Sequence, residues 1–399
     1  MLRILNEKET LSKAAITSGS FTSEIGLSEE EADRFIDFVI DESGLKDQVR
    51  LERMTTESKK IDVLNLGSSV LKPGVAAVDP GETVSISTRQ IELKAKEVIA
   101  IVRISDDSLE DNIEGDAFAQ HLLGMIARAS GNELEDSLLY GRQLSPGTPT
   151  FIDQLYQGWI SEALDNGNVV DAAGAGFSDR FIDREKMSAL VKALPTKFRR
   201  NKRNMRLSMA DDIDQDWSDQ VLAPRETPQG DNAITGDSPN RYRSIAFRPS
   251  GLFRVNRPVL VSGGGSTTLD EGEPAAETAI AVASETNFAA GDKVVVARGT
   301  ALEEEVTVDS TGAGLVTIEA PGLKFAHETS TTFEEVTLDG TDVLLADYRN
   351  LILGIQRDVR LEPDRLPRLR ATDWVLTMRI DAKVEEPEAL ALLKSLKVR

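Results

Sequence analysis

The sequence contains no cysteine and only two histidines among its 399 residues. Without cysteine the chain forms no disulfide and offers no thiolate to a metal or a nucleophilic mechanism, so packing alone must hold its fold together. Aromatic residues are also few, at 5%. Together these absences remove the commonest metal ligands and leave few candidates for a general base.

Long apolar runs are also absent. No segment approaches the roughly 18 residues of a membrane-spanning helix, and residues 1–10 lack the basic-then-apolar layout of a signal peptide. We therefore expect a protein that is made in the cytoplasm and has no membrane partner.

Positive charge is in deficit, because 46 Lys and Arg face 67 Asp and Glu, a formal net charge of −21. This balance predicts that the chain does not hold phosphate backbones, since such binding needs clustered basic residues. The excess is uneven: residues 262–340 hold 15 acidic residues against 3 basic ones.

Catalytic motifs are missing as well. The sequence has no G-x-S-x-G elbow, H-E-x-x-H helix or phosphate-binding glycine loop. We expect His121 to pack on a helix and His327 to lie in a turn. With 67 acids, carboxylate pairs arise by chance, and no apolar pocket that would raise the pKa of one is evident. The sequence predicts no enzyme and no cofactor.

One acidic cluster has the spacing of a metal loop. Alternate Asp residues begin a calcium loop, but counted from Asp212 the sixth position holds Trp217 in place of the required Gly, and the twelfth holds Ala223 in place of Glu. We expect a solvated loop without metal; its acids are Asp211, Asp212, Asp214 and Asp216.

The N-terminal third alternates between helical and extended patterns. Ser28 and Glu31 form a capping box before a short apolar helical stripe of Phe35, Phe38 and Val39. Residues 59–104 then show a period of two with a Pro-Gly turn, which predicts a long two-stranded excursion. Next comes a predicted helix of about 25 residues that ends at Gly141, with apolar positions Phe118, Leu122, Met125 and Ala129.

The later segments predict an α/β arrangement with an insertion. An amphipathic helix ends near Pro195, and "NMRLSMA" follows it as a strand. Residues 262–340 open at "SGGGSTT", which resembles a flexible connector, and continue as short strands typical of a small antiparallel barrel or sandwich. The flanking apolar segments, including "LLADYRNLILG" at residues 344–354, predict core strands of one host sheet.

The C-terminal segment shows the clearest alternation. One predicted strand face is apolar, and "EEPEALALLKSLK" then predicts a closing helix with Pro387 in its first turn. The apolar face consists of Trp374, Leu376, Met378, Ile380, Ala382 and Val384.

The order of these parts resembles the major capsid proteins of tailed bacteriophages, with the HK-ninety-seven-like fold. Two stretches carry the resemblance best, "LLADYRNLILGIQRDVRLEPD" and "ATDWVLTMRIDAKVEEPEALALLK". The implied fold is α+β. Its expected parts are an N-terminal arm (1–57), an extended hairpin loop (58–104), the long helix and peripheral domain (105–179), an axial domain (180–261), an inserted β-barrel-like domain (262–340), an axial return (341–370), and a peripheral closing strand and helix (371–399).

The resemblance implies a function without catalysis. A major capsid protein assembles into pentamers and hexamers of an icosahedral shell that encloses double-stranded DNA without binding it specifically. The expected location is the virion, after assembly in the host cytoplasm. The expected partners are further copies of the chain, a separate scaffolding protein, a portal and cement proteins. An encapsulin-like nanocompartment shell is the alternative.

Charge suggests where subunits meet. Residues 59–103 have a net charge of +2 in an otherwise acidic chain, and an acidic run follows them directly. Because like-charged subunits repel, contacts are expected where the signs differ. The hypothesis places Lys94 and Lys96 of one subunit against an acidic run of its neighbour that includes Asp106, Asp107, Glu110 and Asp111.

Overall fold

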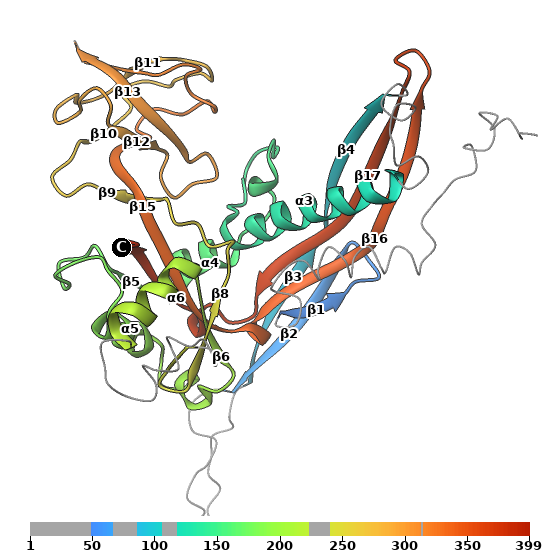
Figure 1. The fold of residues 1–399 in the computed structure, drawn as a ribbon, viewed down its shortest axis with the longest axis horizontal. Coiled ribbons are helices and arrows are strands. Elements are labelled where there is room, and N and C mark those ends of the chain that lie inside the picture. The colour runs from blue at the N-terminus through green and yellow to red at the C-terminus, as the bar shows by residue number, and fades with distance from the viewer. Residues whose placement is uncertain (1–48, 67–85, 106–117, 223–239, 313) are drawn as a thin grey trace, which may run out of the picture.

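The computed structural model describes residues 49–66, 86–105, 118–222, 240–312 and 314–399. These residues form two main sheets and a separate hairpin, with helices beside them (Figure 1). Helix and extensive sheet in separate segments make this an α+β fold, as expected. The predicted N-terminal helix and the Pro-Gly turn of the hairpin lie outside the described residues.

A four-stranded sheet forms the elongated part of the molecule. Its strand order is β1-β16-β17-β4, and the long helix α3 crosses it in the view of Figure 1. Leu134 and Leu138 of α3 join the same hydrophobic cluster as Leu376 of β17. The bounds are β1 Arg50–Arg53, β4 Lys96–Ser105, α3 Phe118–Tyr140, β16 Leu351–Leu366 and β17 Ala371–Val384.

Two of these elements confirm the patterns that predicted them. Helix α3 has 23 residues and stops at Gly141, where a side chain would lie 2.5 Å from the Ser137 carbonyl. Strand β17 buries the predicted face from Leu376 to Val384, although Trp374 is only half-buried. Asp381 is buried as well, on the opposite face.

The hairpin consists of β2 (Ser58–Leu66) and β3 (Ile86–Lys94). The two strands pair in an unbroken antiparallel register from Ser58 opposite Lys94 to Leu66 opposite Ile86. The predicted excursion is therefore two-stranded up to Lys94. Beyond that point β4 leaves the hairpin and pairs with β17.

A second sheet forms the part of the molecule that we call the axial lobe, because it contains most of the strands of the expected axial domain. Across this lobe the strands follow the order β5-β18-β15-β6-β8-β7, so that β5 and β7 are its outer strands. The bounds are α4 Trp159–Asn166, β5 Asn168–Asp171, α5 Arg184–Ala193, β6 Met205–Met209, α6 Asp211–Trp217, β7 Arg241–Tyr242, β8 Ile245–Pro249, β15 Thr332–Asp347 and β18 Ala391–Leu396.

The inserted segment continues this sheet through β15. One half of β15 pairs with β18 and β6, and the other half pairs with β9, β10 and β12. The five strands predicted from residues 278–337 are all present. The remaining bounds are β9 Arg257–Leu260, β10 Ser266–Thr268, β11 Ala279–Ala281, β12 Lys293–Val296, β13 Glu304–Gly312 and β14 Leu315–Ile318.

The closing helix was predicted wrongly. A single 3-10 turn at Pro387–Ala389 is followed by strand β18, which lies between β15 and β5. All five residues from Ala389 to Leu393 are buried. A helix on the surface would expose part of such a run, whereas a central strand buries both of its faces.

Three other local predictions need correction. The acidic cluster begins helix α6, because Ile213 and Trp217 lie four residues apart and are both buried. The "SGGGSTT" segment is ordered, since Gly265 donates a hydrogen bond to Glu335 and packs against Phe288. The segment 344–354 was predicted to belong to one host sheet, but a 3-10 turn at residues 348–350 interrupts it and β16 then joins the four-stranded sheet and not the axial one.

Candidate assembly surfaces

The base of the hairpin is fixed to its own chain. Leu93 is fully buried and packs with Met54, Ala95 and Ile352 in a small cluster apart from the main core. The backbone N–H of Lys94 donates to Asp381 Oδ2 at 2.7 Å. A buried carboxylate that accepts a backbone N–H holds the strand in place, so the hairpin projects from a rigid base.

The two predicted contact lysines have separate environments. Lys94 is exposed, and its Nζ lies 3.2 Å from Glu92 Oε2. Lys96 is half-buried: its ammonium donates to the Leu155 carbonyl and lies 5.9 Å from the centre of the Tyr156 ring. Burial lowers the pKa of Lys96. The separation arises at Ala95, where the chain passes from β3 to β4.

The acids assigned to that contact lie outside the described residues. They are Asp106, Asp107, Glu110 and Asp111. Of the two lysines, only Lys94 holds its ammonium at the surface of the hairpin, where it pairs with Glu92.

Strand β4 presents an open edge. Among the described strands it pairs only with β17. Val98 and Ala100 pack against the main core, while Ile99 and Ile101 are 56% and 62% exposed. An unpaired edge with exposed β-branched residues is a surface on which another chain can pair, and soluble proteins usually protect such edges.

An ionic network, buried at Asp342 and exposed at Arg254, joins α3, β9 and β15. The Arg257 guanidinium donates to Asp342, whose side chain is 2% exposed. Arg254 bonds Asp136 of α3 at 3.0 Å, and both arginines stack over the Tyr140 ring with centroid distances of 4.9 and 5.1 Å. Burial raises the pKa of the Tyr140 hydroxyl. The network fixes the end of the long helix against the strand shared by the axial lobe and the insertion.

No pattern in the sequence predicted this network. Its only local signal is a pair of arginines three residues apart within the apolar stretch "SGLFRVNRPVLV". Their carboxylate partners lie 85 and 118 positions away, so no local pattern identifies them.

Of the two histidines, the structure describes the side chain of His327 alone. His327 is buried and not in an exposed turn, and its Nε2 lies 2.6 Å from Glu304 Oε1. Glu304 also accepts backbone N–H groups from Lys324 and Phe325, so the pair organises a loop of the insertion. The side chain of His121 lies outside what the structure describes.

No group of His, Asp and Glu in the described ranges has the arrangement of a metal site. No helix in the described part of the chain is long and apolar enough to span a membrane.

No family model matches the sequence. The chain is 26% identical, over 396 residues, to the Bacillus subtilis (strain 168) protein named "Putative prophage capsid protein YqbE", and the alignment covers 98% of this chain and all of that protein. The model also superposes on a chain of the solved structure "Satellite phage P4 procapsid including size determination (Sid) protein". That match has a TM-score of 0.54 and 10% identity, covering 96% of this chain and 95% of the other. The chain therefore has the fold of the phage capsid proteins, the family that its sequence resembles.

Proposed function

We propose that the chain is a major capsid protein that assembles into the pentamers and hexamers of an icosahedral shell around double-stranded DNA. The observation that carries the proposal is the full-length match, in sequence to a prophage capsid protein and in fold to a procapsid chain. A match over nearly all of both chains leaves little of this protein for an unrelated activity. A structural role without catalytic residues is part of the proposal.

The encapsulin alternative is not favoured. The sequence relative is a prophage capsid protein and aligns from end to end, including the inserted segment. Virion location, with assembly in the host cytoplasm, follows from the same proposal.

The open edge of β4 supports assembly. Ile99 and Ile101 lie next to Glu97 and Arg103, so an apolar strip has charged residues on both sides. We infer that another subunit covers this strip in the shell. Burying two isoleucines there would contribute several kcal/mol per contact, at roughly 1.5–3 kcal/mol each.

The hairpin contact remains part of the proposal in reduced form. Lys94 is the residue of the pair available to face a neighbour's acidic run, because Lys96 binds within its own chain. An exposed ion pair is worth about 0 to 1 kcal/mol. It would affect assembly because the same pair forms at every such subunit contact in the shell.

The inserted domain is proposed as a unit that projects from the shell or meets a neighbouring capsomer. Scaffolding, portal and cement proteins are the proposed partners in assembly. The chain expressed alone should then give monomers, capsomers or irregular particles, because no scaffolding protein directs closure.

Electron microscopy of purified particles tests the function. Co-expression with the scaffolding protein of the same phage should give closed shells, and particles from lysates should contain DNA. Particles filled with an enzyme would favour the encapsulin alternative, and a chain that never assembles under either condition would contradict the proposal.

Two matched variants locate the contact surface. Ile101→Glu should block assembly while leaving the melting temperature nearly unchanged, since Ile101 is already exposed. Leu315→Glu, at an exposed apolar position on the insertion, is the control and should assemble normally where the insertion projects from the shell. Weaker assembly of this variant would mean that the insertion meets a neighbouring capsomer. Lys94→Glu should slow assembly, and added salt should have a similar effect on the unaltered chain.

A further inference from the structure

Positive charge gathers at one edge of the axial sheet. The segments 196–206 and 240–249 together hold nine Lys and Arg and no Asp or Glu. They are separated in sequence, but β6 pairs with β8 and β8 pairs with β7, which brings them together. The overall charge of −21 therefore conceals a basic surface.

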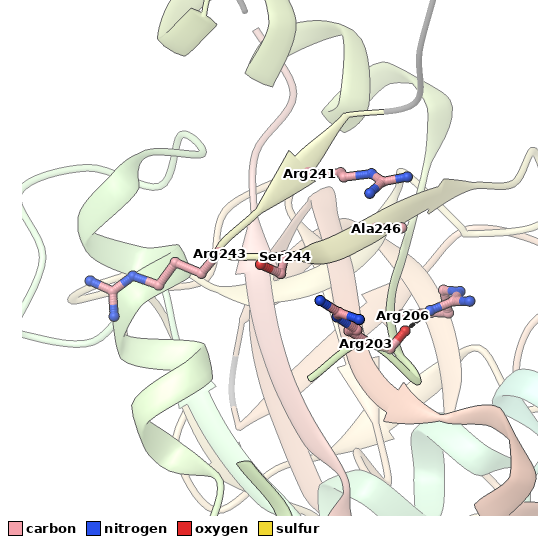
Figure 2. Close-up of a pocket in the computed structure, with 6 residues that line it drawn as sticks. All are labelled: Arg203, Arg206, Arg241, Arg243, Ser244 and Ala246. Atoms are coloured by element: carbon pink, nitrogen blue, oxygen red, sulfur yellow. Dashed lines mark hydrogen bonds between the residues drawn. The ribbon is translucent and has the colours of Figure 1, made fainter. Parts of the chain in front are cut away.

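The strand register builds a pocket within this surface. Arg206, Ala246 and Arg241 are direct cross-strand neighbours on β6, β8 and β7. Such neighbours point to the same face of a sheet, so two arginines stand on either side of a small alanine floor. Figure 2 shows the arrangement, and the volume of the pocket is about 690 Å³. Its lining residues are Arg203, Arg206, Arg241, Arg243, Ser244 and Ala246.

Among the residues that the structure describes, no acidic side chain lines the pocket beside its arginines. Arg206 Nη1 donates to the carbonyls of Arg203 and Met205 at 2.6 and 2.9 Å. A guanidinium has five N–H donors, so this anchoring orients the group and leaves donors free for a ligand.

The turn between β7 and β8 departs from the usual residue types. Arg243 and Ser244 have positive φ angles of 48° and 74°. A two-residue hairpin of this kind normally holds Asn-Gly, because positive φ is unfavourable for other side chains. An arginine kept at such a position favours a role for its charge over a role in stability. Figure 2 shows its side chain pointing outward at the rim.

We propose that this pocket binds phosphate groups of a nucleic-acid backbone, without regard to base sequence. The proposal rests on the proposed function, in which the shell encloses DNA. One carboxylate would neutralise a single arginine, whereas a phosphodiester strand presents a charge about every 3.4 Å.

The lining also distinguishes nucleic acid from a protein partner. Protein interfaces centre on aromatic or aliphatic anchors, whereas Ala246 is the one apolar residue among the described residues of this lining. The described lining also contains no aromatic ring on which a base could stack. Phosphate contacts position a nucleic acid but do not read its sequence, so binding is expected to be sequence-independent.

Fluorescence anisotropy with a labelled DNA duplex of about 20 base pairs tests the proposal on unassembled full-length subunits. Binding should weaken as salt rises. Arg206→Gln combined with Arg241→Gln should weaken binding about tenfold per lost phosphate contact at about 50 mM salt, and should lower the salt slope by about 0.9 per contact.

Two further variants separate charge from folding. The control, Arg184→Gln with Lys293→Gln, removes the same charge from α5 and the insertion and should bind DNA as the unaltered chain does. Arg243→Asn should bind DNA more weakly while its melting temperature stays equal or rises, because Asn tolerates positive φ. If Arg243 had only a structural role, DNA affinity and melting temperature would fall together.

Three results would overturn the proposal: no DNA binding at low salt, equal loss in the control, or unchanged binding in the arginine variants. If DNA is not bound but the variants assemble poorly, the pocket instead contacts an acidic surface of another subunit. Closed shells from subunits without DNA affinity would refute the pocket and leave the proposed function intact. DNA affinity in a chain that never assembles would support the pocket and refute the proposed function.

Discussion

The inserted unit and the axial lobe share strand β15 but are stabilised by different cores. The insertion has its own hydrophobic cluster of eleven residues, all between Leu269 and Phe333. The axial lobe belongs to the large cluster that also includes α3 and the four-stranded sheet. One strand therefore serves two separate cores.

The insertion and the axial lobe also differ in charge. The insertion carries much of the chain's negative charge, whereas one edge of the axial sheet is basic. The insertion is therefore independent in its hydrophobic core and still rigidly coupled to its host. The coupling comes from β15 and from the Arg257–Asp342 pair beside it.

The largest expected effect comes from breaking that coupling. Asp342→Asn leaves the half-buried Arg257 without its counter-charge, and breaking a buried ion pair typically costs about 3–5 kcal/mol. Denaturant unfolding should show the loss in stability. Asp309→Asn, at an exposed position of β13, is the control and should change little.

A double variant sharpens this test. Replacing both partners, Arg257→Met with Asp342→Leu, should recover most of the stability, because no charge is then left unpaired. A double variant as unstable as the single one would show that the pair contributes more than charge compensation.

The independence of the two cores can be tested next. Phe333 is fully buried in the insertion and Phe247 is buried in the axial lobe, and Phe→Ala typically costs about 3–5 kcal/mol. In calorimetry, Phe333→Ala should lower the unfolding temperature of the insertion. Phe247→Ala should lower the unfolding temperature of the rest of the chain. Leu315→Ala, at an exposed position, is the control. A single transition lowered equally by both variants would contradict separate cores.

A pH-dependent prediction concerns Glu135 of α3, on the axial side of the comparison. Its side chain is buried, neither carboxylate oxygen has a hydrogen-bond partner among the described residues, and burial raises its pKa to about 7. Because the folded state holds this proton more tightly than the unfolded state, stability should fall as pH rises from about 4.5 to about 7. The loss is at most about 3 kcal/mol.

Glu135→Gln should therefore be more stable than the unaltered chain at pH 8 and similar to it at pH 4, as measured by thermal unfolding across pH. Glu133→Gln, on the exposed side of the same helix, should keep the original pH profile. A profile for Glu135→Gln that parallels the unaltered one would show that Glu135 is not the titrating group.

The smallest expected effect lies inside the insertion. Glu304→Ala removes the acceptor for two backbone N–H groups and for His327, and an unsatisfied buried group costs about 1–3 kcal/mol. Glu304→Gln keeps an acceptor oxygen and should cost less. Thermal unfolding should show this order, with the exposed Glu319→Ala as control. Equal losses for Ala and Gln would mean that the charge itself is needed.

Much of the fold could be predicted because its signals are local. The period of two in 59–94 and in β17, the helical spacing that ends at Gly141, and the short strands of the insertion all depend on near neighbours in the chain. A change from helical to strand periodicity, or a glycine that ends a helix, can be identified without knowing which residues pack against the segment. The resemblance to a capsid protein came from the order of these local elements.

The candidate contacts could be predicted only in part. Lys94 and Lys96 share a face in any continuous strand, but the chain changes sheets at Ala95, and Lys96 then faces Tyr156. No sequence pattern marks such a change, because it depends on β17 being available as a partner. The same holds for β16, whose partner strand lies in a different sheet from β15.

The sequence by itself determined the local elements, the absence of disulfides and the acidic total, because these depend on composition and on residues a few positions apart. Only the tertiary structure decided that 391–396 is a strand and that Arg257 meets Asp342. It also decided that four arginines from segments about 35 residues apart line one pocket. The physical reason is that strand pairing and burial depend on partners distant in sequence, and a charge total contains no information about which charges become neighbours.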